Sequence, residues 1–332
     1  MTTSPGATST PPITGWLVSS AGRRGELVNI LRSTPVCGQV RPVTTVDITP
    51  LSAASQLADH HALVARCREP EFLPQVITVA EQYHANVIIP TIDPEISVYS
   101  AAREQLAARG ISAWVSAPAV VELGWDKWVL ARWCQEHNLP YPATVEAGAA
   151  VPFPGPVIAK PRSGSASIGV RRYESSASIA DDLPHDYIVQ EAVPGVEVTI
   201  DFAVGHQGTL LGYCARKRLE VRAGEVSKAV TIDHPAINRL MEEIAPLLQG
   251  AYGMLNLQVF LDEAQGKVTI LELNPRFGGG FPLAHAAGTG LLEALIDDMA
   301  GREPGPVKRG KPGVVMLRYD AHTICSAKDM GL

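Results

Sequence analysis

Residues 268–283, with the sequence VTILELNPRFGGGFPL, combine side chains that could bind a metal ion and a phosphate. An apolar strand carries Glu272 and Asn274 two positions apart, so both side chains project from the same face. A carboxylate oxygen beside an amide oxygen suits a hard cation such as Mg²⁺. Arg276 follows with a planar guanidinium that fits phosphate oxygens. Taken alone, the segment is also compatible with a buried strand that ends in a glycine turn.

A second segment places one lysine on an otherwise apolar strand, Val157–Pro161 (VIAKP). Burial of the Lys160 ammonium is costly unless it meets an anion. The loop that follows, residues 163–169 (SGSASIG), has small residues whose backbone N–H groups can approach phosphate oxygens. It lacks the Walker A pattern GxxxxGK[ST], and a mobile hairpin is the alternative interpretation. The lysine just before the loop favours a phosphate-binding role for Ser163, Gly164, Ser165 and Ser167.

Further polar side chains occur between and beside these two segments. Residues 187–197 (YIVQEAVPGVE) place Glu191 and Glu197 around a Pro-Gly turn. The two carboxylates are either solvated edge charges or polar anchors for a nucleoside. Gln258 lies on a later strand and could supply a further oxygen to a cation at Glu272.

The elements that must position these residues fall into two parts. Over residues 14–116, strands alternate with helices, which predicts a parallel doubly wound sheet with ligands beyond the carboxyl ends of its strands. Two loops fall at that edge, residues 22–25 and 91–93, and each is either a ligand contact or plain turn chemistry. Residues 57–63 are predicted to be helical or irregular, and residues 118–138 to form one helix. Farther along, the pattern becomes that of antiparallel strands.

The composition argues against several classes of protein. The net charge of −6 over 332 residues argues against general nucleic-acid binding, which normally shows a basic excess. The five cysteines are scattered without a CxxC pair, so a disulfide framework or zinc site is not expected and a reducing cytoplasm fits best. No apolar run is long enough to span a membrane. Residues 1–13, rich in Ser, Thr and Pro, are predicted to be a disordered leader.

The order of these features resembles the ATP-grasp superfamily. It runs from a lysine on a helix, Lys127, through Lys160 and the small-residue loop to a QExVxGxE segment at 190–197 and an ExNxR strand at 272–276. The resemblance is greatest to the single-module branch that is similar to carbamoyl-phosphate synthases and carboxylate–amine ligases. It implies an α/β and α+β chain in which a Rossmann-like pre-ATP-grasp domain precedes a two-lobed ATP-grasp domain.

The resemblance also implies a domain organisation. A separate C-terminal domain is expected to be absent or minimal, because the sequence is short after residue 300. The predicted parts are a leader (1–13), the Rossmann-like domain (14–116), a small lid lobe (117–188), a large lobe with the metal site (189–310) and a C-terminal extension (311–332).

The nucleotide implied by the resemblance is ATP. Lys127 and Lys160 are expected to contact its triphosphate, while the 163–169 loop closes over it as a lid. Backbone groups of the following segment are expected to recognise adenine, and a glutamate the ribose hydroxyls. The residues of that segment assigned to the nucleoside are Gln190, Glu191, Val193 and Glu197.

Metal binding and phosphoryl transfer are assigned by the same resemblance. Gln258, Glu272 and Asn274 are expected to hold Mg²⁺, with Mn²⁺ as an alternative ion. Arg276 is expected to brace the transferred phosphoryl group. In such a site, cations and a metal gather where negative charge develops, and the lid excludes water.

The sequence leaves substrate recognition open. A cationic stretch, residues 216–230 (RKRLEVRAGEVSKAV), is either a solvated loop or a substrate-binding element. In the second interpretation, Arg218 or Lys228 meets the substrate carboxylate or the acylphosphate. An amino acid fits paired basic and acidic groups, as do other metabolites. The groups that could hold a second substrate across the domain cleft are Arg23, Arg24 and Asp93.

The leading prediction is an ADP-forming ligase that joins a carboxylate to an amine, with an amino acid as the expected substrate, through an acylphosphate. The alternatives are a carbamoyl-phosphate-synthase-like phosphotransferase acting on bicarbonate or carbamate, and a nucleotide-binding regulator without turnover. The intact metal set counts against the regulator, and the missing GxGxxG fingerprint counts against a nicotinamide-dependent oxidoreductase. Expected partners are ATP and small-molecule substrates, with no nucleic acid and no membrane. A homodimer is compatible with this prediction.

Overall fold

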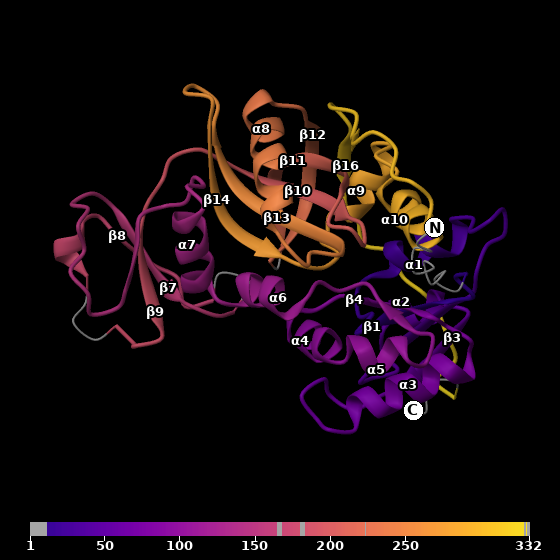
Figure 1. Cartoon of the computed structure of the whole chain (residues 1–332). Coiled ribbons are helices and arrows are strands. Elements are labelled where there is room, and N and C mark those ends of the chain that lie inside the picture. The colour runs from indigo at the N-terminus through magenta and orange to yellow at the C-terminus, as the bar shows by residue number, and fades with distance from the viewer. Residues whose placement is uncertain (1–11, 165–167, 180–182, 223, 329, 331–332) are drawn as a thin grey trace, which may run out of the picture.

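The computed structural model describes residues 12–164, 168–179, 183–222, 224–328 and 330. It contains a parallel-sheet domain, a small antiparallel sheet and a large antiparallel sheet, and the small sheet extends from the rest of the molecule on the side of β14 (Figure 1). The predicted combination of an α/β domain with a two-lobed α+β region is therefore confirmed.

The N-terminal sheet has the strand order β3-β2-β1-β4-β5, and each strand pairs in parallel with its neighbours. Its strands are β1 (Trp16–Ser19), β2 (Val43–Asp47), β3 (His60–Leu63), β4 (Val87–Pro90) and β5 (Ser112–Ala113). The central strands β1 and β4 are buried along their whole length, as strands covered on both faces must be. The connecting helices are α1 (Gly25–Ser33), α2 (Ala53–Leu57), α3 (Phe72–Gln82), α4 (Asp93–Ala101) and α5 (Arg103–Ala107).

Two predictions for this domain need correction. The expectation that residues 57–63 are helical or irregular is wrong for the second half, because His60–Leu63 forms the edge strand β3. Three of its four residues are exposed, so no apolar pattern marks the strand in the sequence. Residues 1–11 of the predicted leader (1–13) lie outside the described residues. Its last residue, Ile13, is 3% exposed and packs into the core, so the predicted leader extends too far.

The predicted single helix over residues 118–138 is interrupted. It consists of α6 (Pro118–Trp125) and α7 (Lys127–Glu136), separated by Asp126 in an extended conformation. The Asp126 carboxylate accepts hydrogen bonds from the backbone N–H groups of Trp128 and Val129, so it caps α7. The interruption places Lys127 in the first turn of a helix rather than in the middle of one.

The small lobe is a four-stranded antiparallel sheet of order β6-β9-β7-β8. Its elements are β6 (Thr144–Glu146), β7 (Val157–Pro161), β8 (Arg171–Tyr173), the 3₁₀ turn η1 (Ser176–Ser178) and β9 (Tyr187–Glu191). The predicted lobe boundary between residues 188 and 189 cuts through β9. Because Glu191 still pairs with Val157 of β7, we propose a boundary after Glu191.

The large lobe is built on the sheet β14-β13-β10-β11-β12-β16, with β15 paired in parallel to β11. Its strands are β10 (Val196–Val204), β11 (Leu210–Arg222), β12 (Glu225–Ile232), β13 (Gly253–Asp262), β14 (Lys267–Asn274), β15 (Lys308–Arg309) and β16 (Val315–Leu317). The cationic residues 216–230 fall mainly in β11 and β12, so the prediction of a loop is wrong, although residues 219–222 and Lys228 are exposed to solvent. Residues 315–317 also belong to this sheet, because β16 pairs with β12.

Both faces of the large sheet are covered. On one face, α6, α7 and α8 (Pro235–Ile244), which η2 (Ala245–Leu247) follows, pack against alternate residues of β10, β13 and β14. On the other face, α9 (Phe281–Ala286) and α10 (Leu291–Met299) share a hydrophobic cluster with β1 and α1 of the N-terminal domain. The N-terminal domain and the large lobe thus share a continuous core, which fixes loops of one against loops of the other. No helix within the described ranges is long and apolar enough to cross a membrane.

Candidate active site

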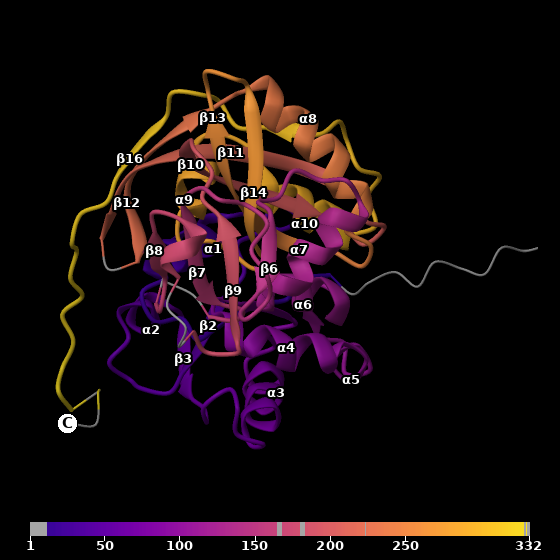
Figure 2. The same cartoon turned by 90° about the vertical axis from the view of Figure 1, so that its left-hand side faces the viewer.

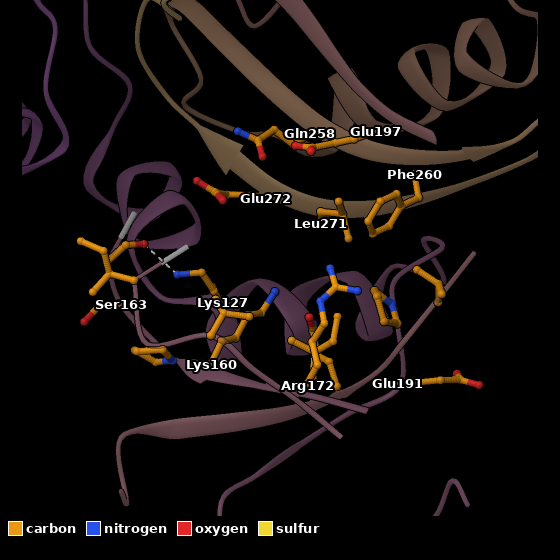
Figure 3. A pocket seen from close by; sticks show the side chains of 18 residues that line it. Lys127, Lys160, Ser163, Arg172, Glu191, Glu197, Gln258, Phe260, Leu271 and Glu272 are labelled. Atoms are coloured by element: carbon orange, nitrogen blue, oxygen red, sulfur yellow. Dashed lines mark hydrogen bonds between the residues drawn. The ribbon is translucent and has the colours of Figure 1, made fainter. Parts of the chain in front are cut away.

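A cavity of about 190 Å³ lies between the small lobe and the large lobe. Figure 3 shows Lys127, Lys160 and Arg172 on one side of it, facing Gln258 and Glu272 on the other. The cavity brings together most of the predicted nucleotide and metal residues from segments that are far apart in the sequence. Those that line it are Lys127, Lys160, Ser163, Gly164, Gln190, Glu191, Val193, Glu197, Gln258 and Glu272.

Lys127 is held at the cavity by the break between α6 and α7. Its Nζ donates to the backbone oxygen of Gly164 at 2.9 Å, and its backbone N–H donates to that of Arg162 at 2.9 Å. The Arg162 guanidinium in turn lies 2.7 Å from the Asp126 carboxylate that caps the helix. The cap, the strand end and the small-residue loop are therefore tied to one another around the Lys127 ammonium.

Lys160 lies on β7 and faces the same space. Burial and, to a smaller extent, the Lys127 charge lower the pKa of its ammonium, Glu272 partly offsets them, and the resulting pKa is about 8. Burial also lowers the pKa of Lys127, while the carboxylates of Glu272, Asp126 and Asp93 raise it. Two half-buried ammonium groups that repel each other favour an anion between them, which is what a triphosphate supplies.

The predicted metal residues lie on two paired strands. Gln258 of β13 is the direct cross-strand partner of Glu272 of β14, and Asn274 follows on the same face as Glu272. Asn274 is 4% exposed and is not among the residues that line the cavity. This set offers one carboxylate and two amide oxygens. It fits Mg²⁺, which is usually held by one or two carboxylates together with substrate phosphates.

Arg276 is positioned by a residue of the N-terminal domain. Its Nε and Nη2 donate to the two carboxylate oxygens of Asp93 at 2.5 and 2.9 Å. Burial lowers the pKa of Arg276, but hydrogen bonding and charge from Asp93 outweigh it, so the net shift is upward. Asp93 starts α4 just beyond β4, so the loop at residues 91–93 does contact the candidate site. The guanidinium is thereby fixed in a permanently charged, oriented state.

The nucleoside residues lie at the end of β9 and the start of β10. Gln190 is 2% exposed, and its side-chain amide donates to Thr144. The Glu191 side chain is exposed and turns away from the cavity centre, which leaves its backbone at the cavity (Figure 3). Glu197 accepts from the Arg218 guanidinium at 2.7 Å. Arg218 therefore braces Glu197 and is not itself a lining residue of the cavity.

One further predicted residue, Lys228, does not line this cavity. Lys228 lies on β12, about half exposed, and its Nζ pairs with Glu220 at 2.7 Å, so its predicted contact with substrate has no support in its position. Ser165 and Ser167 lie outside the described residues. The other two predicted loop residues, Ser163 and Gly164, line the cavity. Gly164 adopts φ +112°, a conformation that residues with a side chain rarely adopt.

Sequence reasoning missed several lining residues, three of which matter for the chemistry, and a buried ion pair. Arg172 of β8 adds a third cation, and Phe260 and Leu271 supply apolar surface on the large lobe (Figure 3). The period of two along β13 could have indicated Phe260, which follows Gln258 on the same face, whereas Leu271 is the extra residue at the bulge between β13 and β14. Arg172 lies on a short exposed strand with no pattern to distinguish it.

The buried ion pair lies beneath the glycine turn that follows β14. Arg216 donates from Nε to Asp201 at 2.9 Å, and the two side chains are 3% and 0% exposed. A Cβ on Gly280 would overlap the Arg216 guanidinium, and one on Gly278 would lie 2.9 Å from the Asp201 carboxylate. The glycines therefore let the turn that carries Arg276 pack directly onto the pair.

Comparison with known families agrees with this geometry. Residues 125–280 match the family described as the ATP-grasp domain, and residues 16–114 match the PylC-like, N-terminal domain. The chain contains an ATP-grasp domain. Its ATP-grasp domain begins at the helix break beside Lys127 and ends in the glycine turn, so it contains both sides of the cavity.

Solved structures place the same fold in several enzymes. Pyruvate carboxylase of Rhizobium etli matches with a TM-score of 0.67 at 18% identity, over 92% of this chain and 30% of that one. The biotin carboxylase domain of Hydrogenobacter thermophilus 2-oxoglutarate carboxylase, in complex with MgADP and bicarbonate, matches with a TM-score of 0.68 at 14% identity. The match covers 90% of this chain and 72% of that one. An L-amino acid ligase from Bacillus licheniformis matches with a TM-score of 0.65 at 14% identity, over 87% of this chain and 75% of that one. A search of curated proteins returned no significant match.

Proposed function

We propose that this protein is an ADP-forming ligase that joins a carboxylate to an amine through an acylphosphate. One observation carries the proposal: Lys127 and Lys160 face the Gln258–Glu272 pair across a single interlobe cavity. That arrangement provides cations for a triphosphate and hard oxygen ligands for a divalent ion at the same place. The similarity in fold to carboxylases and to an amino-acid ligase is consistent with this chemistry.

The residues of the chain have separable tasks in this proposal. Lys127 and Lys160 neutralise the phosphates, and Gly164 and Ser163 bring backbone N–H groups toward them. Phe260 and Leu271 give the base an apolar surface. Gln258, Glu272 and Asn274 would hold Mg²⁺, which supplies charge neutralisation on the phosphates when bound.

The reaction proceeds in two steps that balance. A carboxylate oxygen of the first substrate attacks the γ-phosphorus, the bond to the β-bridging oxygen breaks, and ADP leaves. An amine then attacks the acyl carbon, phosphate leaves with the carboxylate oxygen, and the amine loses a proton. Arg276, fixed by Asp93 next to the metal strand, is the cation we assign to the transferred phosphoryl group.

The proposal is tested by incubating the purified protein with ATP and Mg²⁺ against pooled amino acids, small carboxylates and bicarbonate. ADP and phosphate that form only with particular substrates support the ligase and identify the pool. Bicarbonate alone as the required substrate would instead support the phosphotransferase alternative. Production of AMP and pyrophosphate would contradict the proposed chemistry, because it requires attack at the α-phosphorus.

A further inference from the structure

A single carboxylate faces three guanidinium groups at the start of β12. The Glu225 carboxylate lies 2.6 Å from Arg318, 3.5 Å from Arg24 and 3.9 Å from Arg23. Arg24 and Glu225 are largely buried, with side chains 16% and 21% exposed. One negative charge against three positive ones leaves this cluster, named here the Glu225 cluster, with an excess of positive charge in a partly desolvated place.

The Glu225 cluster lies where an α/β sheet binds its ligands. The strand order β3-β2-β1-β4-β5 reverses direction between β1 and β4, and ligands of such sheets bind at the carboxyl ends of the strands at that point. Arg23 and Arg24 follow β1, and Asp93 follows β4. The loops that carry them are fastened together by buried Glu95, which accepts hydrogen bonds from the Ser19 hydroxyl and the Thr91 backbone N–H.

The same cluster touches the glycine turn of the ATP-grasp domain. Arg318 donates from Nη2 to the backbone oxygen of Gly279 at 2.9 Å, and a Cβ on Gly279 would lie 2.7 Å from the Arg24 guanidinium. Arg276 is influenced electrostatically by Glu272 on one side and by Glu225 on the other. The Glu225 cluster is therefore close to the position assigned to phosphoryl transfer but outside the interlobe cavity.

The charges in the cluster are not balanced by the protein alone. Burial lowers the pKa of Arg24, Glu225 partly offsets this, and the charges of Arg276, Arg318 and Arg23 lower it again. A bound anion would relieve this repulsion. An amino acid that donates its amine keeps a free carboxylate, and that carboxylate must be held away from the γ-phosphate to avoid being phosphorylated itself.

We propose that Arg24 and Arg318 bind the free carboxylate of an amino acid whose amine is the acceptor in the ligation, an inference that rests on the proposed function. Glu225 holds the two guanidinium groups in place through its ion pairs with both. Arg318 follows β16, which lies along β12 at the outer edge of the large sheet (Figure 2), so the C-terminal strand completes the substrate site. Arg318 is then a specificity-determining residue.

Binding measurements without turnover test this inference. Wild-type protein in MgADP is screened by thermal shift against the 20 L-amino acids and the available D-enantiomers, and each amino acid that raises the Tm is measured by calorimetry. We expect at least one to bind, and its decarboxylated amine to bind at least about tenfold more weakly, because a charge-assisted hydrogen bond is lost. Arg318→Ala should weaken binding of the amino acid by about 10- to 100-fold and leave ADP affinity unchanged.

Matched variants separate recognition from folding. Arg318→Lys should recover part of the amino-acid affinity, because it restores the charge without the planar fork. Arg24→Gln changes the arginine that the N-terminal domain contributes, and it should weaken binding of the same amino acid. Arg109→Ala removes an exposed arginine that pairs with Glu81 at 2.8 Å, and it should change neither affinity.

Two outcomes would overturn the inference. One is a wild-type protein that binds ADP but no amino acid in the screen, and the other is a folded Arg318→Ala or Arg24→Gln variant that keeps wild-type amino-acid affinity. Either can occur while ADP and phosphate still form with some other amine, in which case the ligase stands and only the acceptor site fails. Absence of ADP formation with every carboxylate and amine would instead reject the proposed function, whatever the binding data.

Discussion

The low pKa of Lys160 makes nucleotide affinity depend on pH above neutrality. In the nucleotide-free protein the ammonium has a pKa of about 8, lowered by burial and by Lys127. A bound polyphosphate favours the charged form, so binding raises this pKa. Below pH 8 the group is charged before and after binding, and affinity is full. Above pH 8 binding must take up a proton, so affinity falls as pH rises.

The size of the effect follows from that pKa. A group with a pKa of about 8 is roughly nine-tenths protonated at pH 7 and one-tenth protonated at pH 9. If only the charged form binds well, affinity falls about tenfold between these values, or about 1.4 kcal/mol. Burial also lowers the pKa of Lys127, and its titration acts on the affinity in the same direction.

Calorimetric titration with ADP at constant Mg²⁺ between pH 7 and pH 9 measures this dependence, since the phosphate groups of ADP titrate mainly below this range. Lys160→Arg should make ADP affinity less dependent on pH, because a guanidinium stays charged at pH 9. Lys160→Met should bind ADP about 10- to 100-fold more weakly at pH 7 and show a shallower pH dependence. A wild-type affinity that is constant from pH 7 to pH 9, or an unchanged slope in Lys160→Met, would refute the reasoning.

Three other substitutions give distinct outcomes. Glu272→Ala should lower ADP production by at least about 100-fold with the Tm unchanged. The control Glu263→Ala, at the exposed tip of the β13–β14 hairpin, should leave turnover intact. Equal rates of ADP production in the two variants would reject the metal assignment. Asp201→Ala leaves Arg216 buried without a partner and should cost about 3–5 kcal/mol, measured by urea unfolding, and a loss below about 1 kcal/mol would show that the pair is dispensable. Asp126→Ala should lower the free energy of unfolding by about 1 kcal/mol, because the α7 cap is lost, and should also weaken ADP binding. Unchanged ADP affinity would show that the helix start does not position Lys127.

The sequence predicted those parts of the site that lie on regular strands or in short motifs. Glu272 and Asn274 share a face because strands alternate, whereas Gln258 opposes Glu272 because a bulge shifts the β13–β14 register by one residue between Val259 and Gln258. The alternation of strands and helices before residue 116 was likewise sufficient to predict the parallel sheet. These inferences depend only on local geometry.

Features set by contacts between distant segments could not be predicted in the same way. The Asp93–Arg276 pair joins residues 183 positions apart, and no local pattern indicates it. The charge run at residues 216–230 looked solvated, yet Arg216 is buried because Asp201 on the neighbouring strand neutralises it. The contribution of Arg318 depends on β16 returning to the edge of β12, which only the tertiary structure determines.

The acylphosphate is the central claim, and the fate of one oxygen atom tests it most directly. A carboxylate substrate found in the product screen is labelled with ¹⁸O in its carboxyl group, and the nucleotide and phosphate products are analysed by mass spectrometry. The proposed mechanism predicts that one labelled oxygen passes from the carboxylate into inorganic phosphate, with ADP unlabelled. Label in AMP, or phosphate that carries no label while the amide product forms, would contradict it.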